Sequence, residues 1–293
     1  ITINGGTIAA RNDNNGAAGI GGGNEGAGGA ITINGGTITA SGGGGAAGIG
    51  GGLFGAGGTI TINGGTVTAI GESGAGIGSG SFGSGGTITI NGGTITATYT
   101  VLSSGIGAGS GGSNVTLEVH GNAFIIASSI SAQTDKDTWS GVIFEGSAGQ
   151  VYGNPILETD AEIPGDKTLT ILQDRTLTIG NGVTLTNNGS VDNHGTIQKN
   201  GMIINNGTIK NYGTVQGNGA VEGNPILYQS GTVVTFWKEN SQVTEASYGD
   251  TITIVATMTQ KAQSRAAGAK QVEFSVDGTV FATVDVENEN GQI

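Results

Sequence analysis

The chain has 293 residues, including 61 glycines and no cysteine, and its formal net charge is −12. Without cysteine there is neither a disulfide framework nor thiol chemistry. With 10 Lys plus Arg against 22 Asp plus Glu, the chain lacks the basic face that nucleic acids and anionic membranes require.

The first part of the chain is a repeat. The stretch TITINGGTITA at 87–97 recurs with small changes at 1–9, 30–40 and 59–69, and a degenerate fifth copy begins at Val115. A second landmark, the isoleucine of a G-I-G triplet, recurs in step at 20, 49, 77 and 106. Within each copy Ile or Val alternates with Thr, which is the period of a β-strand. The Asn-Gly-Gly that follows permits a sharp bend.

A unit of this size with three short strands cannot bury its own apolar face, but it can when stacked on copies of itself. We therefore predict a right-handed parallel β-helix with three strands per rung over residues 1–122. Its isoleucines form internal columns. Repeated asparagines form a ladder of side-chain amides, made of Asn4, Asn34, Asn63 and Asn91.

Residues 123–228 are predicted to continue the β-helix with a shorter rhythm. From Gly189 to Gly219 a glycine recurs every six residues, and an aliphatic residue does the same from Val191 to Val221. The left-handed hexapeptide helix of acyltransferases is the rival interpretation. It is disfavoured because a small residue does not follow the aliphatic one, as in Val191-Asp192.

Residues 229–293 have no short repeat. Alternating patterns predict strands at 251–258, 272–276 and 279–286, and Asp277-Gly278 predicts a hairpin turn. This segment resembles the start of a bacterial Ig-like domain, and such sandwiches run to about 100 residues. We therefore expect an all-β chain that ends in a partial Ig-like β-sandwich.

Two longer resemblances point to an origin. The run IPGDKTLTILQDRTLTIGNGVTLTNNGSVDNHGTI at 163–197 resembles modular surface proteins of Gram-positive bacteria. The ITINGGTITA…GAGIG units are similar to a clostridial carbohydrate-binding β-helix family. The resemblance implies an extracellular bacterial protein, on the cell surface or secreted. No signal peptide is visible, and because the chain opens inside a repeat we expect it to be part of a longer protein.

The clostridial family binds calcium through an acidic residue in a GDGI-like corner. Here residues 74–77 read GAGI, and the other corners read AGI or SGI. We therefore expect no cofactor and leave calcium binding open, although the acidic corner residues that it would need are absent.

Enzymatic activity is not expected, although β-helices include polysaccharide lyases and hydrolases. Glycosidases need two carboxylates about 5–10 Å apart, and no acid recurs at an equal position of the repeat. The remaining acids lie within 135–166, at Asp135, Asp137, Glu145, Glu158, Asp160, Glu162 and Asp166. His120 and His194, each before a glycine, have no metal-site spacing.

The sequence offers candidates for a polysaccharide-binding surface. One is an outward threonine grid on a strand face, made of Thr37, Thr39, Thr66, Thr68, Thr94 and Thr96. Such grids bind ice in antifreeze proteins, but Thr also simply suits exposed strand positions. The other is aromatic: Trp139 and Tyr152, with Tyr228, Phe236 and Trp237 further on. These residues either stack on sugars or close a module junction.

These patterns favour a non-catalytic surface protein, an adhesin or stalk that binds polysaccharide or host or cell-wall glycan. The alternatives are a lyase or hydrolase relative that uses the acids of 135–166, and a spacer whose repeats only set length.

Overall fold

The computed structural model describes residues 1–13 and 15–228, and after these the strand backbones of 232–238, 241–243, 253–258, 271–276 and 279–285. The chain divides into two units, Ile1–Leu227 and Tyr228–Ile293. Apart from one short 3-10 helix, η1 (Lys136–Thr138), every described element is a strand. The fold is all-β, as predicted.

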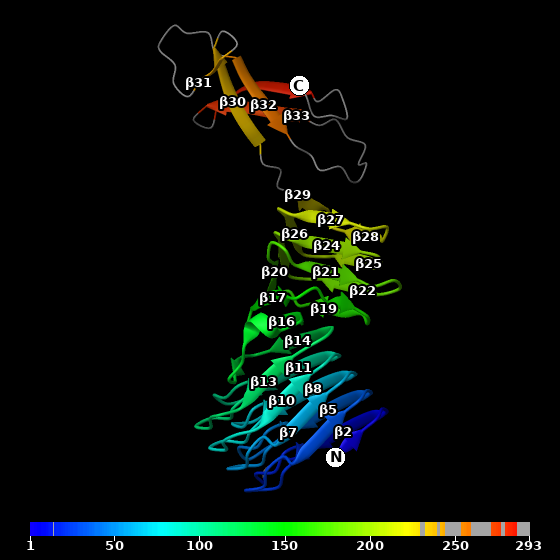
Figure 1. Ribbon diagram of the computed structural model, residues 1–293, viewed down its shortest axis with the longest axis vertical. Coiled ribbons are helices and arrows are strands. Elements are labelled where there is room, and N and C mark those ends of the chain that lie inside the picture. Colours follow the sequence, from blue (N-terminus) through cyan, green and yellow to red (C-terminus); the bar gives the residue numbers. More distant parts are fainter. Residues whose placement is uncertain are drawn as a thin grey trace. The chain divides into compact units, whose positions relative to one another are not determined.

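The first solenoid has three strand faces, and in each face a strand pairs in parallel with its equivalent one rung away (Figure 1). The first face contains β1 (Thr2–Ile3), β4 (Ala30–Ile33), β7 (Thr59–Ile62), β10 (Thr87–Ile90) and β13 (Thr116–Val119). The second face contains β2 (Thr7–Arg11), β5 (Thr37–Ser41), β8 (Thr66–Gly71), β11 (Thr94–Tyr99) and β14 (Ala123–Ala127). The third face contains β3 (Ile20–Gly21), β6 (Ile49–Gly50), β9 (Ile77–Gly78), β12 (Ile106–Gly107) and β15 (Ile130–Ser131).

The repeat sets the register of this solenoid. Ile31, Ile60 and Ile88 pair directly on successive rungs and are buried, which confirms the predicted aliphatic columns. The fifth copy forms β13 and continues into β14 and β15. The predicted boundary at residue 122 therefore falls inside the fifth rung.

The predicted asparagine ladder is also present, on the bend between the first two faces. Each Nδ2 donates to the Oδ1 of the asparagine one rung earlier at 2.8 Å, in the series Asn4, Asn34, Asn63 and Asn91. These side chains are exposed. The ladder therefore joins rungs at the surface, outside the core.

Glycine is required where the third-face strands stack. Gly78 has φ +140°, and a Cβ on it would lie 1.9 Å from the Gly107 carbonyl oxygen. Gly50 has φ +131°, and its Cβ would meet the Gly78 oxygen at 2.0 Å. These glycines therefore let neighbouring backbones approach closely, and they are not a sign of disorder.

A hairpin ends the first solenoid. β14 pairs in parallel with β16 (Gly141–Glu145), but β16 pairs antiparallel with β17 (Ala148–Tyr152). β17 then pairs in parallel with β20 (Thr168–Ile171). One sheet of 11 strands thus runs through both solenoids, and its strand direction reverses at the hairpin.

The core changes to the other face of this shared sheet at the same point. Ile125 and Ile143 pair directly and belong to the core of the first solenoid. Phe124, Val142 and Phe144 point to the opposite face and belong to the core of the second. The hand of a solenoid depends on the strand direction, on the side of the sheet that faces the core and on the direction in which the rungs advance. At the hairpin the first two are both reversed and the third is unchanged. The two reversals cancel, so both solenoids wind with the same hand.

The second solenoid has a shorter, three-faced coil, in which equivalent asparagines are 18 residues apart. Its part of the shared sheet contains β20, β23 (Ser190–Asn193), β26 (Thr208–Asn211) and β29 (Ile226–Tyr228). The next face contains β18 (Ile156–Leu157), β21 (Thr176–Ile179), β24 (Thr196–Lys199) and β27 (Thr214–Gln216). The last face contains β19 (Ala161–Ile163), β22 (Thr184–Asn187), β25 (Met202–Asn205) and β28 (Val221–Gly223). Three faces of six residues make one coil, which explains the six-residue rhythm.

Asparagines also point inward in this coil, which the sequence interpretation did not anticipate. Asn187 donates to Asn205 at 2.7 Å and Asn193 to Asn211 at 2.5 Å, and all of them are buried. The Oδ1 atoms of Asn187 and Asn193 have no partner among the described residues. One coil earlier, Asn187 pairs with Ile163 and Asn193 pairs with Ile171, so each column of amides ends at an isoleucine.

The second unit contains β30 (Thr232–Lys238), β31 (Ser241–Val243) and β32 (Thr253–Met258) in one antiparallel sheet. β33 (Gln271–Val276) and β34 (Thr279–Asp285) form an antiparallel pair. The predicted strands at 272–276 and 279–286 therefore pair as a hairpin requires. Asp277 and Gly278 lie outside the described residues, and the Ig-like assignment stays a prediction.

Replacing Gly78 by alanine should destabilise the first solenoid by about 2–4 kcal/mol, because a left-handed backbone strain adds to a backbone clash. Urea unfolding followed by circular dichroism measures the change. Gly35→Ala is the matched control, since its Cβ would meet only the Asn4 oxygen, at 3.6 Å. Equal midpoints for the two variants would contradict the close-packing role of Gly78.

The two amide ladders should differ in their contribution to stability. Asn205→Ala removes a buried acceptor of Asn187 and should cost about 1–3 kcal/mol, whereas Asn63→Ala on the exposed ladder should cost no more than about 0.5–1 kcal/mol. The same unfolding measurement compares them. A larger loss for Asn63→Ala would show that burial does not decide the ladders' contributions.

Candidate functional site

The predicted threonine grid exists on the outer surface of the second face. Thr37, Thr66 and Thr94 pair directly on successive rungs and form one column. Thr39, Thr68 and Thr96 form the next column. All six side chains are exposed or half-buried. Neighbouring rungs are about 4.8 Å apart, so the hydroxyls form a regular flat array.

The grid ends differently on its two sides. At the first rung Ala9 pairs with Thr39, which interrupts one column. At the fifth rung Phe124 and Ile126 pair with Thr94 and Thr96. From there the same face of the sheet faces the core of the second solenoid. Both columns are therefore present together only on β5, β8 and β11, while one of them continues to Thr7 on β2.

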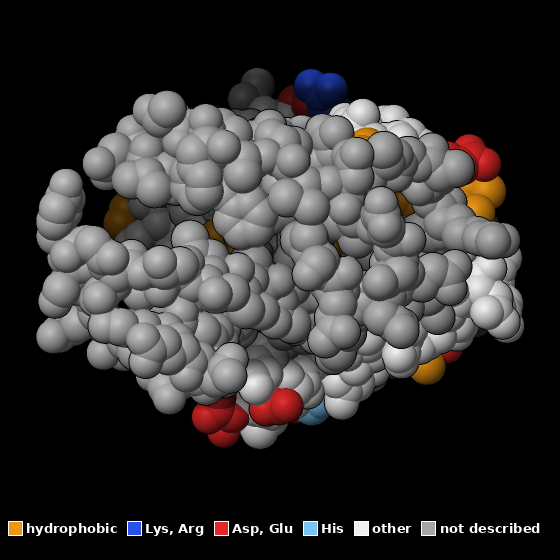
Figure 2. Space-filling view, turned by 90° about the horizontal axis from the view of Figure 1, so that it is seen from above, with side chains coloured by type: hydrophobic (Ala, Val, Ile, Leu, Met, Phe, Trp, Pro, Cys, Tyr) orange, Lys and Arg blue, Asp and Glu red, His pale blue; other side chains and the backbone are white. Residues whose placement is uncertain are grey.

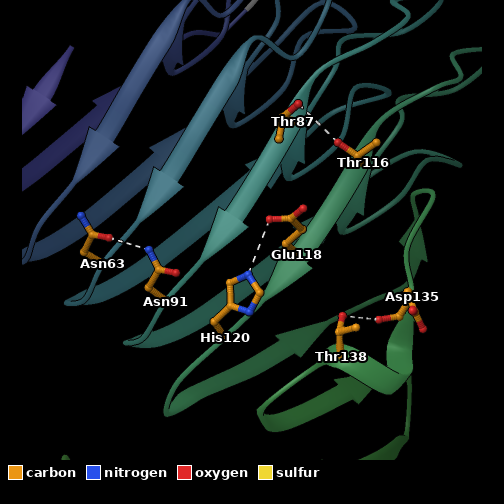
Figure 3. Close-up of polar contacts among 8 residues, drawn as sticks. All are labelled: Asn63, Thr87, Asn91, Thr116, Glu118, His120, Asp135 and Thr138. Carbon is orange, nitrogen blue, oxygen red and sulfur yellow. Dashed lines mark hydrogen bonds and ion pairs between the residues drawn. The ribbon is translucent and has the colours of Figure 1, made fainter.

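The first face carries a second threonine array. Thr59 pairs with Thr87 and Thr87 with Thr116, and the Thr116 and Thr87 hydroxyls are 3.3 Å apart (Figure 3). The asparagine ladder, of which Figure 3 shows the Asn63–Asn91 step, lies at the bend that follows. Because threonine fills outward positions on both faces, the grid alone does not single out one binding face.

Trp139 does not lie open on the surface as a stacking platform; of the two roles that the sequence allowed, it has the one of closing a module junction. Its side chain is 3% exposed and packs in the core of the first solenoid. It follows η1, in the segment between β15 and β16, and it closes the end of that core. Its indole Nε1 has no hydrogen-bond partner among the described residues.

Tyr152, at the end of β17, meets Trp139 edge to face, with ring centroids 5.3 Å apart. The two aromatic residues chosen from the sequence are thus brought together, from either side of the β16–β17 hairpin. Both line a pocket of about 380 Å³. This pocket, which we call the junction pocket, is lined by Ile130, Lys136, Trp139, Ile143, Glu145, Ala148, Gly149, Gln150, Tyr152 and Thr170.

The junction pocket forms where the core of the first solenoid stops while the shared sheet continues. Ile143 still belongs to that core, and Gln150 and Thr170 are the next residues on the same face of the sheet. The segment carrying Lys136 and Trp139 closes the core and forms the opposite wall. The pocket therefore has an apolar side from the first solenoid and a polar side from the start of the second.

Polar groups border the junction pocket. Lys136 Nζ lies 3.1 Å from a Glu145 carboxylate oxygen and 5.4 Å from the centroid of the Trp139 ring. The side-chain polar groups of Gln150, Tyr152 and Thr170 have no hydrogen-bond partner among the described residues. Aromatic side chains with a few convergent polar groups are typical of a small-molecule site.

Several of the other acids of 135–166 take part in local contacts. Asp135 caps η1 by accepting from the Asp137 backbone, and the Thr138 hydroxyl donates to the Asp135 carbonyl (Figure 3). Asp160 accepts from the Thr184 backbone N–H at 2.8 Å, and Glu162 accepts from Asn188 at 2.7 Å. These carboxylates bind separate backbone and side-chain groups of the turns.

The two histidines lie in different surroundings. His120 follows the asparagine ladder and lies 3.5 Å from Glu118 (Figure 3). His194 stacks flat on Tyr212 of the next coil, with ring centroids 4.6 Å apart. Among the described residues, no group of three or more His, Asp or Glu side chains is placed to hold a metal ion.

The visible surface agrees with an acidic composition. Among the described residues that are visible in Figure 2, acidic side chains are spread more widely than basic ones. Within the part of the chain that the structure describes, no helix is long and apolar enough to cross a membrane.

Three polar residues of the junction pocket escaped the sequence interpretation as binding residues: Lys136, Gln150 and Thr170. Lys136 and Gln150 lie outside the repeated units, so no periodicity marks them, whereas Thr170 is on β20, in the second solenoid's part of the shared sheet. The one available signal was the stretch from Trp139 to Tyr152, which has hydrophobic residues on both strand faces at 142–144. Phe236 and Trp237 are in β30, and their side chains lie outside the described residues.

Comparison with known families agrees with the fold. A family model described as "Beta helix repeat" matches residues 1–24, 31–53 and 60–81, which are the first three rungs. No curated protein matches the chain, and no solved structure matches it. These matches cover less than half of the chain, and they agree with the parallel β-helix fold that the strand pairing shows.

Proposed function

We propose that this protein is a non-catalytic extracellular bacterial surface protein, an adhesin or stalk, that binds polysaccharide. The observation that carries the proposal is the junction pocket. There the half-buried Tyr152 packs on the buried Trp139, with ring centroids 5.3 Å apart, and lies beside Gln150 and Thr170, whose side chains have no hydrogen-bond partner among the described residues. Aromatic rings and hydrogen-bonding side chains together suit a sugar ring, which has an apolar face and a hydroxyl edge.

The fold supports a surface or carbohydrate-associated role. Stacked rungs give a long, regular object in which each rung contacts its neighbours. The solvent-facing positions of the first two faces are mostly threonine and asparagine, which present hydroxyl and amide groups that a glycan could bind. The threonine grid therefore remains a second proposed contact surface beside the pocket.

A non-catalytic role is supported by the positions of the carboxylates. Glu145, the acid that lines the junction pocket, is held by Lys136 at 3.1 Å. Asp160 and Glu162 are engaged in turn contacts. A lyase or hydrolase would instead need carboxylates arranged around one substrate bond. The protein is accordingly proposed to hold its ligand unchanged.

The test is a glycan array probed with the whole chain, with calcium and with chelator. Binding to one polysaccharide class, equal in both conditions, is expected. Tyr152→Ala should weaken it by about tenfold, because it removes the aromatic surface. Tyr212→Ala, an exposed tyrosine on the second solenoid, is the matched control and should bind like the wild type.

Other outcomes contradict the proposal in different ways. Release of products from any bound polysaccharide, abolished by Asp135→Asn or Glu158→Gln, would establish the enzyme alternative. Binding that Thr68→Arg abolishes and Tyr152→Ala leaves intact would move the site to the threonine grid. No binding to any glycan would favour the spacer alternative.

A further inference from the structure

The charges around the junction pocket indicate which kind of sugar it accepts. Lys136 is the only basic side chain that lines it and Glu145 the only acidic one. They lie 3.1 Å apart, and each is less than half exposed. The pair leaves no net charge within the pocket lining, so a charged ligand would have to displace one partner.

Further acids lie beside Lys136 in the sequence. Asp135 and Asp137 flank Lys136 in sequence and both are exposed, and the whole chain carries a formal net charge of −12. A uronate carboxylate that approached Lys136 would therefore compete with Glu145 and be repelled by both aspartates.

Cationic sugars are disfavoured for a different reason. An ammonium group binds an aromatic ring best when it lies over the ring face, within about 6 Å of the centroid. Lys136 Nζ already lies 5.4 Å from the centroid of Trp139. An amino sugar would have to displace Lys136 from both the ring and the carboxylate.

The remaining groups suit an uncharged ligand. Gln150 offers an amide donor and acceptor, and Tyr152 and Thr170 offer hydroxyls. None of the three side chains has a hydrogen-bond partner among the described residues. Ile130 and Ile143 supply apolar surface. A volume of about 380 Å³ is near the lower end of the range of about 300–1,000 Å³ for small-molecule sites, so the pocket suits a short unit rather than an extended chain.

We infer that the junction pocket binds a short neutral pyranose unit, such as a chain end or branch, and selects against uronic acids and free amino sugars. This inference rests on the proposed polysaccharide-binding function. Gln150 is assigned to the ligand's hydroxyl edge, and the Lys136–Glu145 pair excludes charged sugars.

Isothermal titration of the whole chain tests this with three probe sets: neutral hexose and pentose oligosaccharides, oligogalacturonates and glucosamine oligomers. The wild type should bind a neutral probe, and the two charged sets at least tenfold more weakly. Gln150→Ala should weaken neutral binding about two- to tenfold without changing the thermal midpoint. Gln216→Ala, an exposed glutamine on β27, is the matched control.

Charge variants test the selection itself. Glu145→Gln frees the Lys136 ammonium and should raise affinity for oligogalacturonates several-fold. Lys136→Met removes the ammonium that neutralises Glu145 and should raise affinity for glucosamine oligomers several-fold. Selectivity that stays unchanged in both variants would overturn the role of the ion pair.

The failures of the two proposals are distinguishable. Neutral binding that Gln150→Ala leaves intact would overturn the pocket assignment while the polysaccharide-binding function stands. Preference of the wild type for oligogalacturonates would overturn the neutral specificity. Binding of none of the probes, with no glycan bound on the array, would overturn both.

Discussion

The continuous backbone pairing of the shared sheet, from β2 to β29, is the constraint on which the rest of the structure depends. Parallel strands about 4.8 Å apart must place equal repeat positions next to each other. This pairing aligns Ile38 with Val67 and Val67 with Ile95 inside, and threonines outside. Each rung supplies hydrogen-bond partners for the backbone of the next. The first solenoid is therefore held together with few charged residues and no disulfide.

The same sheet also explains why a pocket forms. At the β16–β17 hairpin the strand direction reverses and the core moves to the opposite face. The face that carried Ile125 and Ile143 becomes the outside, and its next residues are Gln150 and Thr170. An apolar interior thus ends beside a polar exterior with only the Lys136–Trp139 segment to close it.

The regular parts of this architecture are readable from the sequence because they repeat. The isoleucine columns and the ladder from Asn4 to Asn91 follow from copies at equal spacing, and the structure confirms both. The inward asparagines of the second solenoid were missed because an Asn two residues before a Gly also fits an exposed bend. Only the coil geometry turns Asn193 inward, where Asn211 satisfies its donor.

The junction could not be predicted in the same way. Val142, Ile143 and Phe144 are all buried, because the shared sheet is covered on both faces there. A strand covered on both faces loses the apolar–polar alternation from which one predicts which side chains point to the core. Trp139 and Tyr152 could be chosen as aromatic candidates, but their meeting depends on the hairpin, which reverses the chain without any repeat to mark it.

The separation between regular and irregular parts bears on how the proposed stalk and the proposed binding site can coexist in one chain. Each rung contacts chiefly its neighbours, so rungs could be added to either solenoid without changing distant ones. The junction pocket uses only the fifth rung, the segment carrying Trp139, the hairpin and β20. Length is therefore set by the number of repeats, whereas the proposed recognition depends on the junction between the two solenoids, where the repeat is interrupted.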